Sequence, residues 1–297
     1  MIHNFDDLLK KVRTENPKRM AVVCAEDPHV LDAVKEAMEL RIVLPIFIGD
    51  EPKITQLIKD YDYPFAHLPI YHTTSKEEAA DWAVRMAKDG EIDILMKGLI
   101  DTKILLKAIV NRETGIKTND LLSHVGLVYS DVMDKMYVVS DIAMNINPNV
   151  SEKAQIIRNA VRVARAIGYS VPKVGIASSV EKVNPKIAST VEAEELVKLY
   201  QQGFFEEMII DGPMAVDCLV SKEAAEHKGL TGEVAGNADV LIFPNLDAGN
   251  IFYKTMVFLA KAKTAGIILG ANVPIVLTSR ADSANSKLNS IALAVAC

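Results

Sequence analysis

The chain has few cysteines, and their pattern supports neither a disulfide framework nor a zinc site. Only three occur in 297 residues, Cys24, Cys218 and Cys297, and they are odd in number and far apart. No CxxC pair is present, and no group of cysteines and histidines has the spacing of zinc ligands. We therefore expect buried, reduced thiols of the kind found in cytosolic proteins, and no bound metal.

The sequence also lacks a targeting segment, a long apolar run and an excess of positive charge. Its first residues have neither a basic region nor an apolar core of a signal peptide. The longest apolar stretch, 265–278, is too short for a membrane span and contains Asn272 and Pro274. With 33 basic and 39 acidic residues the formal charge is -6. This balance argues against a nucleic-acid or membrane partner, and we expect a cytoplasmic protein.

Several common catalytic and phosphate-binding motifs are missing. The chain contains no GxGxxG, no GxxxxGK[ST], no GxSxG and no HExxH. These absences argue against a dinucleotide fingerprint, a P-loop, an α/β-hydrolase elbow and a zinc protease. The glycine-rich stretch 229–236 follows a predicted helix and has no Lys-Ser/Thr pair at its end, so we expect a loop there.

What is present is an alternation of short apolar strands with helices. Helix starts are predicted at Asp27-Pro28, at Ser75 with Glu78 three residues later, and at Ser151. The strand runs are continuously apolar, as in parallel sheets covered by helices on both faces. The pattern therefore predicts an α/β fold with mostly parallel sheets flanked by helices. The strand runs that carry this prediction are 20–25, 42–49, 92–96, 125–129, 136–140, 173–177, 208–210, 240–243 and 275–278.

The length predicts two domains, at roughly 150 residues per domain. The least helical stretch lies around 140–149, and we place the first crossover there. The last helix is expected to return to the first domain. The predicted domains are therefore 1–140 plus 280–297, and 141–279.

Polar residues are concentrated after the predicted strands, at the sheet edge where α/β proteins bind ligands. Amide, hydroxyl and cationic donors dominate these groups, which suits an anionic substrate, and no nucleophile–base pair is evident. Ordinary helix capping, solvated loops and a surface pair between Arg280 and Asp282 are the structural alternatives. The residues are Lys97, Gly98, Thr102 and Lys107 after 92–96, Asn145 after 136–140, Asn245, Asp247, Gly249, Asn250 and Lys254 after 240–243, and Ser279, Arg280 and Asp282 after 275–278.

These segments resemble the phosphate acetyl/butyryltransferase family. The resemblance rests on the segments MKGLIDT (96–102), SDIAMNINP (140–148), DGPMAVD (211–217), VAGNADVLIFPNLDAGNIFYK (234–254) and LTSRADS (277–283). The compact length and the C-terminal sequence are more similar to the butyryltransferase branch. The resemblance implies an acyltransferase that moves a short-chain acyl group, with butyryl favoured, between coenzyme A and inorganic phosphate by direct attack.

The resemblance further implies an isocitrate/isopropylmalate dehydrogenase-like fold, an active site in the interdomain cleft and a homo-oligomer. Coenzyme A and phosphate would be substrates, with no cofactor and no metal. Arg280 would bind phosphate oxygens and Ser279 would hydrogen-bond the reacting group. The family's acetyltransferases place an Asp seven positions after that Ser, but position 286 is Ser here. Asp282 is the nearby candidate base, and Lys107 matches a family Arg.

Three rival functions remain at this stage. A phosphate acetyltransferase would share the chemistry and differ in the size of its acyl pocket. A metal- and NAD-dependent decarboxylating dehydrogenase would share the fold type but would need a set of metal-ligating carboxylates. A non-catalytic sensor of coenzyme A or acyl phosphate would bind the ligand without turnover.

Overall fold

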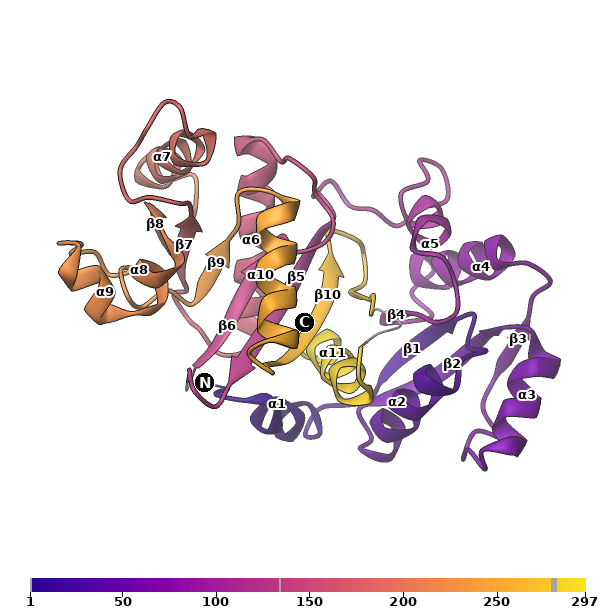
Figure 1. Cartoon of the computed structure of the whole chain (residues 1–297). Helices are drawn as coiled ribbons and strands as arrows, with labels where there is room; N and C mark the ends of the chain where they lie inside the picture. Colours follow the sequence, from indigo (N-terminus) through magenta and orange to yellow (C-terminus); the bar gives the residue numbers. More distant parts are fainter. Residues whose placement is uncertain (1, 134, 279–281) are drawn as a thin grey trace. The chain divides into compact units, whose positions relative to one another are not determined.

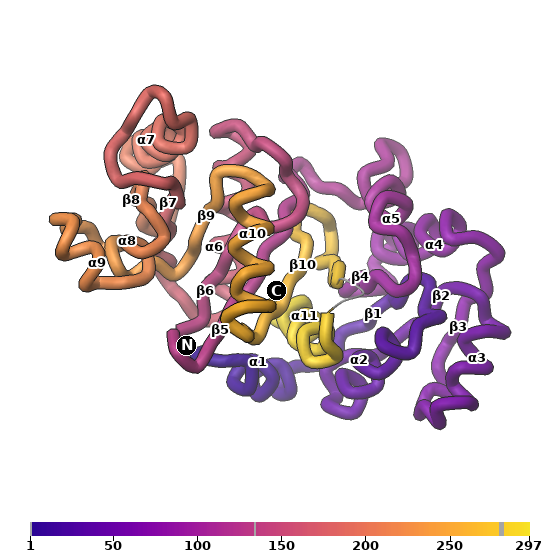
Figure 2. The backbone as a smooth tube through the Cα atoms, viewed as in Figure 1, coloured from indigo at the N-terminus to yellow at the C-terminus, as the bar shows by residue number. Residues whose placement is uncertain are grey.

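The structure is a computed structural model that describes residues 2–133, 135–278 and 282–297. It is a mixed α/β protein whose strands are mostly parallel and flanked by helices, as predicted (Figure 1). The chain divides into two compact units, each built from separate stretches of sequence, and Figure 2 lets the reader follow both. One unit comprises Met1–Asn4 with Ser123–Thr264, and the other comprises Phe5–Leu122 with Ala265–Cys297.

The unit containing Phe5–Leu122 has the strand order β3-β2-β1-β4-β11-β10. All of its strand pairs are parallel except β10 with β11. The last four residues of β1 and all of β4 are buried, which accounts for the apolar sequence of both strands up to Lys97, the last residue of β4. The strands are β1 (Lys18–Val23), β2 (Val43–Gly49), β3 (Ile70–His72), β4 (Ile94–Lys97), β10 (Lys263–Leu269) and β11 (Ile275–Val276), and the helices are α1 (Phe5–Val12), α2 (Pro28–Glu39), α3 (Glu51–Asp60), α4 (Lys76–Lys88), α5 (Thr102–Ile109) and α11 (Ala284–Ala296).

The unit containing Ser123–Thr264 has the strand order β5-β6-β9-β7-β8, and only β5 and β6 pair antiparallel. Helix α6 packs against β5, β6 and β9, while α10 packs against β6 and lies in front of it in Figure 1. The strands are β5 (Ser123–Ser130), β6 (Lys135–Ser140), β7 (Lys173–Ala177), β8 (Ile209–Met214) and β9 (Val240–Ile242), and the helices are α6 (Val150–Ala166), α7 (Ala188–Gln201), α8 (Val216–Val220), α9 (Lys222–His227) and α10 (Leu246–Phe258).

Two of the three predicted helix starts are confirmed, and one is misplaced. Asp27 accepts hydrogen bonds from the amides of His29 and Val30, and Ser75 accepts one from the amide of Glu78 at 3.1 Å. The start predicted at Ser151 is wrong by two residues. Asn149 is the N-cap there, because its side chain and that of Glu152 bond to each other's backbone amides.

The boundaries of the compact units differ from the domain boundaries expected at 140 and 280. They fall at 122/123 and 264/265. The reason is strand pairing, since β6 pairs in parallel with β9 from Val138–Val240 to Ser140–Ile242, which holds β6 and its antiparallel partner β5 in the unit of β9. The boundary expected at 140 would instead place β5 and β6 at the end of the first domain.

The predicted location of the thiols is correct for two of the three cysteines. Cys24 and Cys218 are buried, whereas Cys297 is partly exposed, and all three are free. No helix in the described ranges combines the length and the apolar character needed to cross a bilayer.

Candidate functional site

The first group of predicted site residues lies at the carboxyl end of β4. Lys97 is the last residue of that strand and is only 8% exposed, and its Nζ donates to the carbonyl of Gly98 at 3.3 Å. Gly98 lies against the end of β1, where its amide donates to the carbonyl of Val23. A Cβ at position 98 would lie 2.2 Å from the carbonyl oxygen of Cys24, so this close approach requires glycine.

Thr102 and Lys107 both lie on α5 but at opposite ends of the helix. Thr102 is its first residue, and the N-cap residue Asp101 makes no side-chain capping bond. Lys107 is exposed in the last turn, about 7.5 Å further along the helix axis at 1.5 Å per residue. Thr102 therefore stays close to Lys97 and Gly98 along the chain, whereas the charge of Lys107 is displaced from the strand end.

The second group precedes α11, and two of its members, Ser279 and Arg280, lie outside the described residues. Asp282 is half-buried, and its backbone carbonyl accepts a hydrogen bond from Nζ of Lys287 at 2.5 Å. Ser283 caps the helix through the amide of Ser286, and the two hydroxyls are 3.1 Å apart. The position where the family's acetyltransferases carry an Asp is thus a serine engaged in helix capping.

Sequence reasoning missed Lys287, which is only 3% exposed and lies one turn into α11. A buried lysine is costly unless its ammonium group finds acceptors, and here it binds the backbone beside Asp282. Nothing in the local sequence singles it out, because lysine is usually exposed and its burial is visible only in the folded chain.

In the other unit, the loop after β6 is organised by Asp141. This residue is 3% exposed, and its Oδ1 accepts hydrogen bonds from the amides of Ala143 and Met144 at 2.8 and 2.9 Å. Its Oδ2 accepts one from Nδ2 of Asn145 at 2.5 Å. The carboxylate is therefore fully employed in shaping the loop, and Asn145, a predicted substrate ligand, is fixed by it.

Helix α10 brings the polar run after β9 against that same loop. Asn245 caps the helix by accepting from the amide of Ala248 at 3.0 Å, and Nδ2 of Asn250 donates to the carbonyl of Ile142 at 3.0 Å. A Cβ on Gly249 would lie 2.1 Å from the carbonyl oxygen of Asp141. Four predicted site residues, Asn145, Asn245, Gly249 and Asn250, are thus brought into one packed arrangement.

The backbone amide of Gly249, in the first turn of α10, is already engaged. That amide donates to the carbonyl of Asn245 at 3.2 Å, and the amide of Leu246 donates to the carbonyl of Ile146. The capping side chain of Asn245 occupies the amide of Ala248. Asp247 and Lys254 are exposed on the same helix, so their charged groups face solvent.

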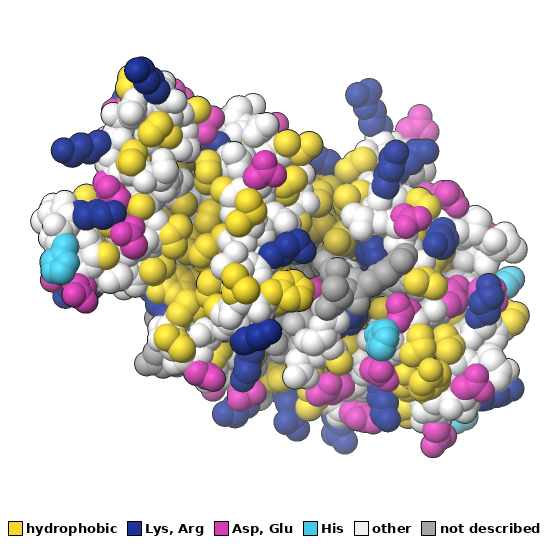
Figure 3. Space-filling model, viewed as in Figure 1, with side chains coloured by type: hydrophobic (Ala, Val, Ile, Leu, Met, Phe, Trp, Pro, Cys, Tyr) yellow, Lys and Arg dark blue, Asp and Glu magenta, His cyan; other side chains and the backbone are white. Residues whose placement is uncertain are grey.

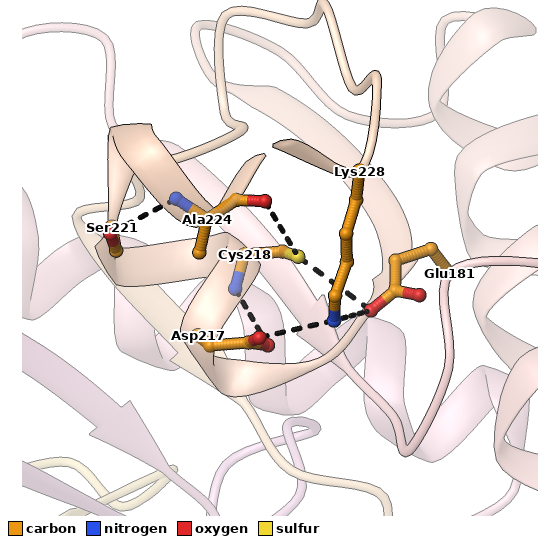
Figure 4. Close-up of polar contacts among 6 residues, drawn as sticks. All are labelled: Glu181, Asp217, Cys218, Ser221, Ala224 and Lys228. Atoms are coloured by element: carbon orange, nitrogen blue, oxygen red, sulfur yellow. Dashed lines mark hydrogen bonds and ion pairs between the residues drawn. The ribbon is translucent and has the colours of Figure 1, made fainter. Parts of the chain in front are cut away.

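A polar cluster that sequence reasoning did not single out joins α8 to the loop after α9 (Figure 4). Nζ of Lys228 lies 2.8 Å from Oε1 of Glu181 and 3.0 Å from Oδ2 of Asp217. These bonds lower the pKa of both carboxyl groups and raise the pKa of the lysine. Burial raises the pKa of the neighbouring Cys218 thiol.

The same cluster contains three side chains of the types that bind metal ions. Within the ranges that the structure covers, Glu181, Asp217 and Cys218 are the one group of three donors close enough to share an ion. The ammonium of Lys228 already contacts both carboxylates, so the group is a satisfied ion-pair network. It gives no support to the metal-dependent dehydrogenase considered from the sequence.

Comparison with known proteins gives the class. The family model for phosphate acetyl/butaryl transferase matches residues 66–295. The chain is 40% identical to a phosphate butyryltransferase of Clostridium acetobutylicum over 99% of this chain and 98% of that protein. It is 42% identical to a phosphate acetyltransferase of Thermotoga maritima over 97% of this chain and 98% of the relative.

A solved structure agrees with these sequence matches. The crystal structure of a branched-chain phosphotransacylase from Enterococcus faecalis V583 superposes with a TM-score of 0.83 at 32% identity, covering 94% of this chain and 98% of that one. The chain therefore belongs to the phosphate acetyl/butaryl transferase family.

Proposed function

We propose that this protein catalyses the reversible transfer of a short-chain acyl group, preferably butyryl, from coenzyme A to inorganic phosphate. The observation that carries the proposal is the full-length match to a relative named phosphate butyryltransferase, at 40% identity. The packed arrangement of Asn145, Asn245 and Gly249 supports it, because the predicted site segments 140–148 and 234–254 meet there.

The proposed reaction needs a thiolate, an acyl carbonyl and a phosphate leaving group. A thiol with a pKa near 8.5 is a few per cent ionised at neutral pH, so a nearby cation or base speeds the step. In one direction the thiolate attacks the acyl-phosphate carbonyl carbon, the bond from carbon to the phosphate oxygen breaks, and phosphate leaves. Donors aimed at the developing oxyanion are worth roughly 3–4 kcal/mol each.

The residues proposed for these roles are Ser279 and Arg280 as donors and Asp282 as the base. The guanidinium of Arg280 matches the two oxygens of a phosphate in one plane. Lys287, whose Nζ binds the carbonyl of Asp282 at 2.5 Å, would position the segment that carries the base. Lys97, buried at the end of β4, supplies a further positive charge for the phosphate or acyl phosphate.

The test is a thiol-release assay with phosphate and a panel of acetyl-, butyryl- and branched acyl-CoA. We expect phosphate-dependent release, with kcat/KM for butyryl-CoA exceeding that for acetyl-CoA by about 10- to 200-fold, the discrimination that one or two methylenes provide. A reaction without phosphate is the control for thioester hydrolysis. Release that does not depend on phosphate would overturn the proposal.

Phosphate acetyltransferase is the second candidate. The match to the Thermotoga maritima protein of that name, at 42% identity, favours it as directly as the butyryltransferase match favours butyryl transfer. Both candidates use the same donors and differ in the pocket that receives the acyl chain. A higher kcat/KM for acetyl-CoA in the same panel would select this function.

Other properties expected from the resemblance stay predictions. They are the isocitrate/isopropylmalate dehydrogenase-like classification, the interdomain position of the active site, a cytoplasmic location and the lack of a cofactor or metal.

The proposed homo-oligomer draws support from the apolar surface of α10 (Figure 3), where Ile251, Phe258 and Leu259 are 66%, 55% and 79% exposed. A contiguous exposed apolar patch is typical of an interaction surface.

A further inference from the structure

A cavity of about 530 Å³ lies at the carboxyl ends of β1, β2 and β3, entirely within the unit containing Phe5–Leu122. Cavities between about 300 and 1,000 Å³ are the size that receives small-molecule ligands. Its lining comes from the end of β3, from the loops after these three strands and after β4, and from the first turns of α3 and α4. None of the predicted site residues lines it.

Thr73 supplies a buried hydroxyl to this cavity. The residue is 5% exposed, and its amide donates to the carbonyl of Gly49 at 2.8 Å. Thr73 lines the cavity, and its hydroxyl makes no hydrogen bond with the residues that the structure describes. A hydroxyl that makes no bond within the protein is available to donate to an oxygen of a bound ligand.

Lys76 supplies a positive charge beside that hydroxyl. It is the first residue of α4 and forms no ion pair with any residue that the structure describes. Its ammonium lies close enough to Cys24 to oppose the rise in the pKa of that thiol. Because the partial charge of a helix N-terminus is also positive, this wall of the cavity favours an anion.

Two negatively charged side chains, Glu26 and Asp50, also line the cavity and follow β1 and β2. Oε1 of Glu26 accepts a hydrogen bond from the amide of Asp50 at 2.5 Å. A Cβ on Gly49, whose φ is +152°, would lie 2.4 Å from that oxygen, so glycine is what allows the carboxylate to lie across the end of β2. A site for phosphate alone would have no use for carboxylates, whereas carboxylates accept hydrogen bonds from sugar hydroxyls.

The sheet order supports a sugar ligand. Strands β3-β2-β1-β4 follow each other as in the dinucleotide-binding half-sheet, where an acidic residue near the end of the second strand holds the ribose. Asp50 occupies that place, although the glycine fingerprint for a pyrophosphate is missing. The formal charges of Glu26 and Asp50 are balanced by Lys53 and Lys76. A ligand with hydroxyl groups and one phosphate matches this lining.

We infer that this cavity binds the ribose phosphate group of a nucleotide, with Glu26 and Asp50 accepting from the ribose hydroxyls and Lys76 and Thr73 donating to the phosphate. The group has two chemical sources, a free nucleoside monophosphate and the phosphorylated ribose of coenzyme A. The second source rests on the proposed function, whereas binding of a free nucleotide does not.

Isothermal titration calorimetry of the full chain with AMP tests the inference. We expect one AMP bound per chain, and a loss of affinity of at least about tenfold in Thr73→Val and in Lys76→Ala, in line with the loss of a hydrogen bond to a charged group. Lys18→Ala, which removes an amine at the opposite end of β1, is the matched control and should bind AMP normally. Thermal unfolding midpoints of all three variants establish that they are folded.

Further titrants separate the two sources. If adenosine 3′,5′-bisphosphate and coenzyme A lose affinity in the same variants, the cavity holds the nucleotide end of coenzyme A. If only AMP loses affinity, the cavity holds a free nucleotide. No AMP binding, unchanged AMP affinity in both variants, or inorganic phosphate binding as tightly as AMP would each overturn the inference. Thiol release measured in parallel reports separately on the proposed acyl transfer.

Discussion

The backbone of Gly249 packs so closely against Asp141 that a Cβ at position 249 would lie 2.1 Å from the carbonyl oxygen of Asp141. This contact joins the loop after β6 to the first turn of α10, and no side chain larger than hydrogen fits between the two backbones. The neighbouring bond from Nδ2 of Asn250 to the carbonyl of Ile142, at 3.0 Å, depends on the same approach. The position of α10 is therefore set by a backbone contact between two predicted site segments.

Gly249→Ala is expected to push α10 away from this loop. The displaced backbone should cost about 1–3 kcal/mol of unfolding free energy, as overpacking does, and activity should fall because the predicted substrate ligands shift. Urea unfolding and the thiol-release assay measure the two effects. Gly203→Ala is the control, because nothing lies within 4 Å of the added Cβ there and only its φ of +81° is strained. Equal activity loss in both variants would contradict the packing argument.

The bond between Asp141 and Asn145 provides a second test. Asp141→Asn places an amide where two backbone amides and the Asn145 amide all need an acceptor. We expect a loss of about 1.5–3 kcal/mol for a hydrogen bond to a charged group. The exchanged pair, Asp141→Asn with Asn145→Asp, restores opposite chemistry across the bond and should recover part of the stability. A double variant no more stable than the single one would show that Asn145 is not the important partner.

The Lys228 cluster predicts a dependence of stability on pH. Its ion pairs lower the pKa values of Glu181 and Asp217, so their contribution is present above the ordinary carboxyl pKa of about 4 and is lost as the pH falls through the lowered values. The raised pKa of Lys228 keeps its charge constant over this range. The stability difference between wild type and Lys228→Met should therefore narrow from about pH 6 to pH 3.

Chemical denaturation at several pH values measures that difference. Lys222→Met is the control, because Lys222 is 82% exposed and lies 4.0 Å from its partner Glu226. Its effect should be small at every pH, as for most surface pairs. A Lys228→Met difference that stays constant down to pH 3 would contradict the assignment of the lowered pKa values to this lysine.

The fold was predictable from the sequence because its signals are local. Asp27 followed by Pro28 and Ser75 followed by Glu78 mark helix starts through bonds within one turn, and both are confirmed. Asn149 was missed because Asn149 and Ser151 are both suitable caps, and only the reciprocal bond with Glu152 decides between them. Local sequence could not show that β6 pairs with β9, which is far from it in the chain, and this pairing moved the boundary of the compact unit.

The ligand roles of the predicted site residues stay predictions, because polar residues near a strand end serve either a ligand or the backbone. Asn245 and Asn250 were expected to bind substrate, and the structure engages Oδ1 of Asn245 and Nδ2 of Asn250 in capping and loop contacts. Lys287 was missed, since its importance comes from burial and from a partner that only the folded chain supplies. Periodicity gives the face of a helix but not the partner of a polar group.

The three thiols should differ in reactivity. Burial raises the pKa of Cys24 to about 12 and also raises the pKa of Cys218, and thiols react as thiolates. Iodoacetamide at neutral pH should therefore modify the partly exposed Cys297 first, as read by mass spectrometry of the native protein. Activity should survive Cys24→Ala, Cys218→Ala and deletion of Cys297, because the reacting thiol belongs to coenzyme A. Loss of turnover in a folded cysteine variant would instead indicate an acyl-enzyme route.

Arg280 carries the sharpest prediction for catalysis. Arg280→Ala should lower kcat/KM for the acyl-CoA and phosphate reaction by at least about a hundredfold, because a bidentate, charge-assisted contact to phosphate is lost. Arg280→Lys keeps the charge but loses the planar fork, so it should recover only part of the rate and show a raised KM for phosphate. Arg41→Ala, at an exposed turn after α2, is the matched control. Near-normal turnover of Arg280→Ala would remove Arg280 from the mechanism and leave Lys97, buried at the end of β4, as the cation that meets the phosphate.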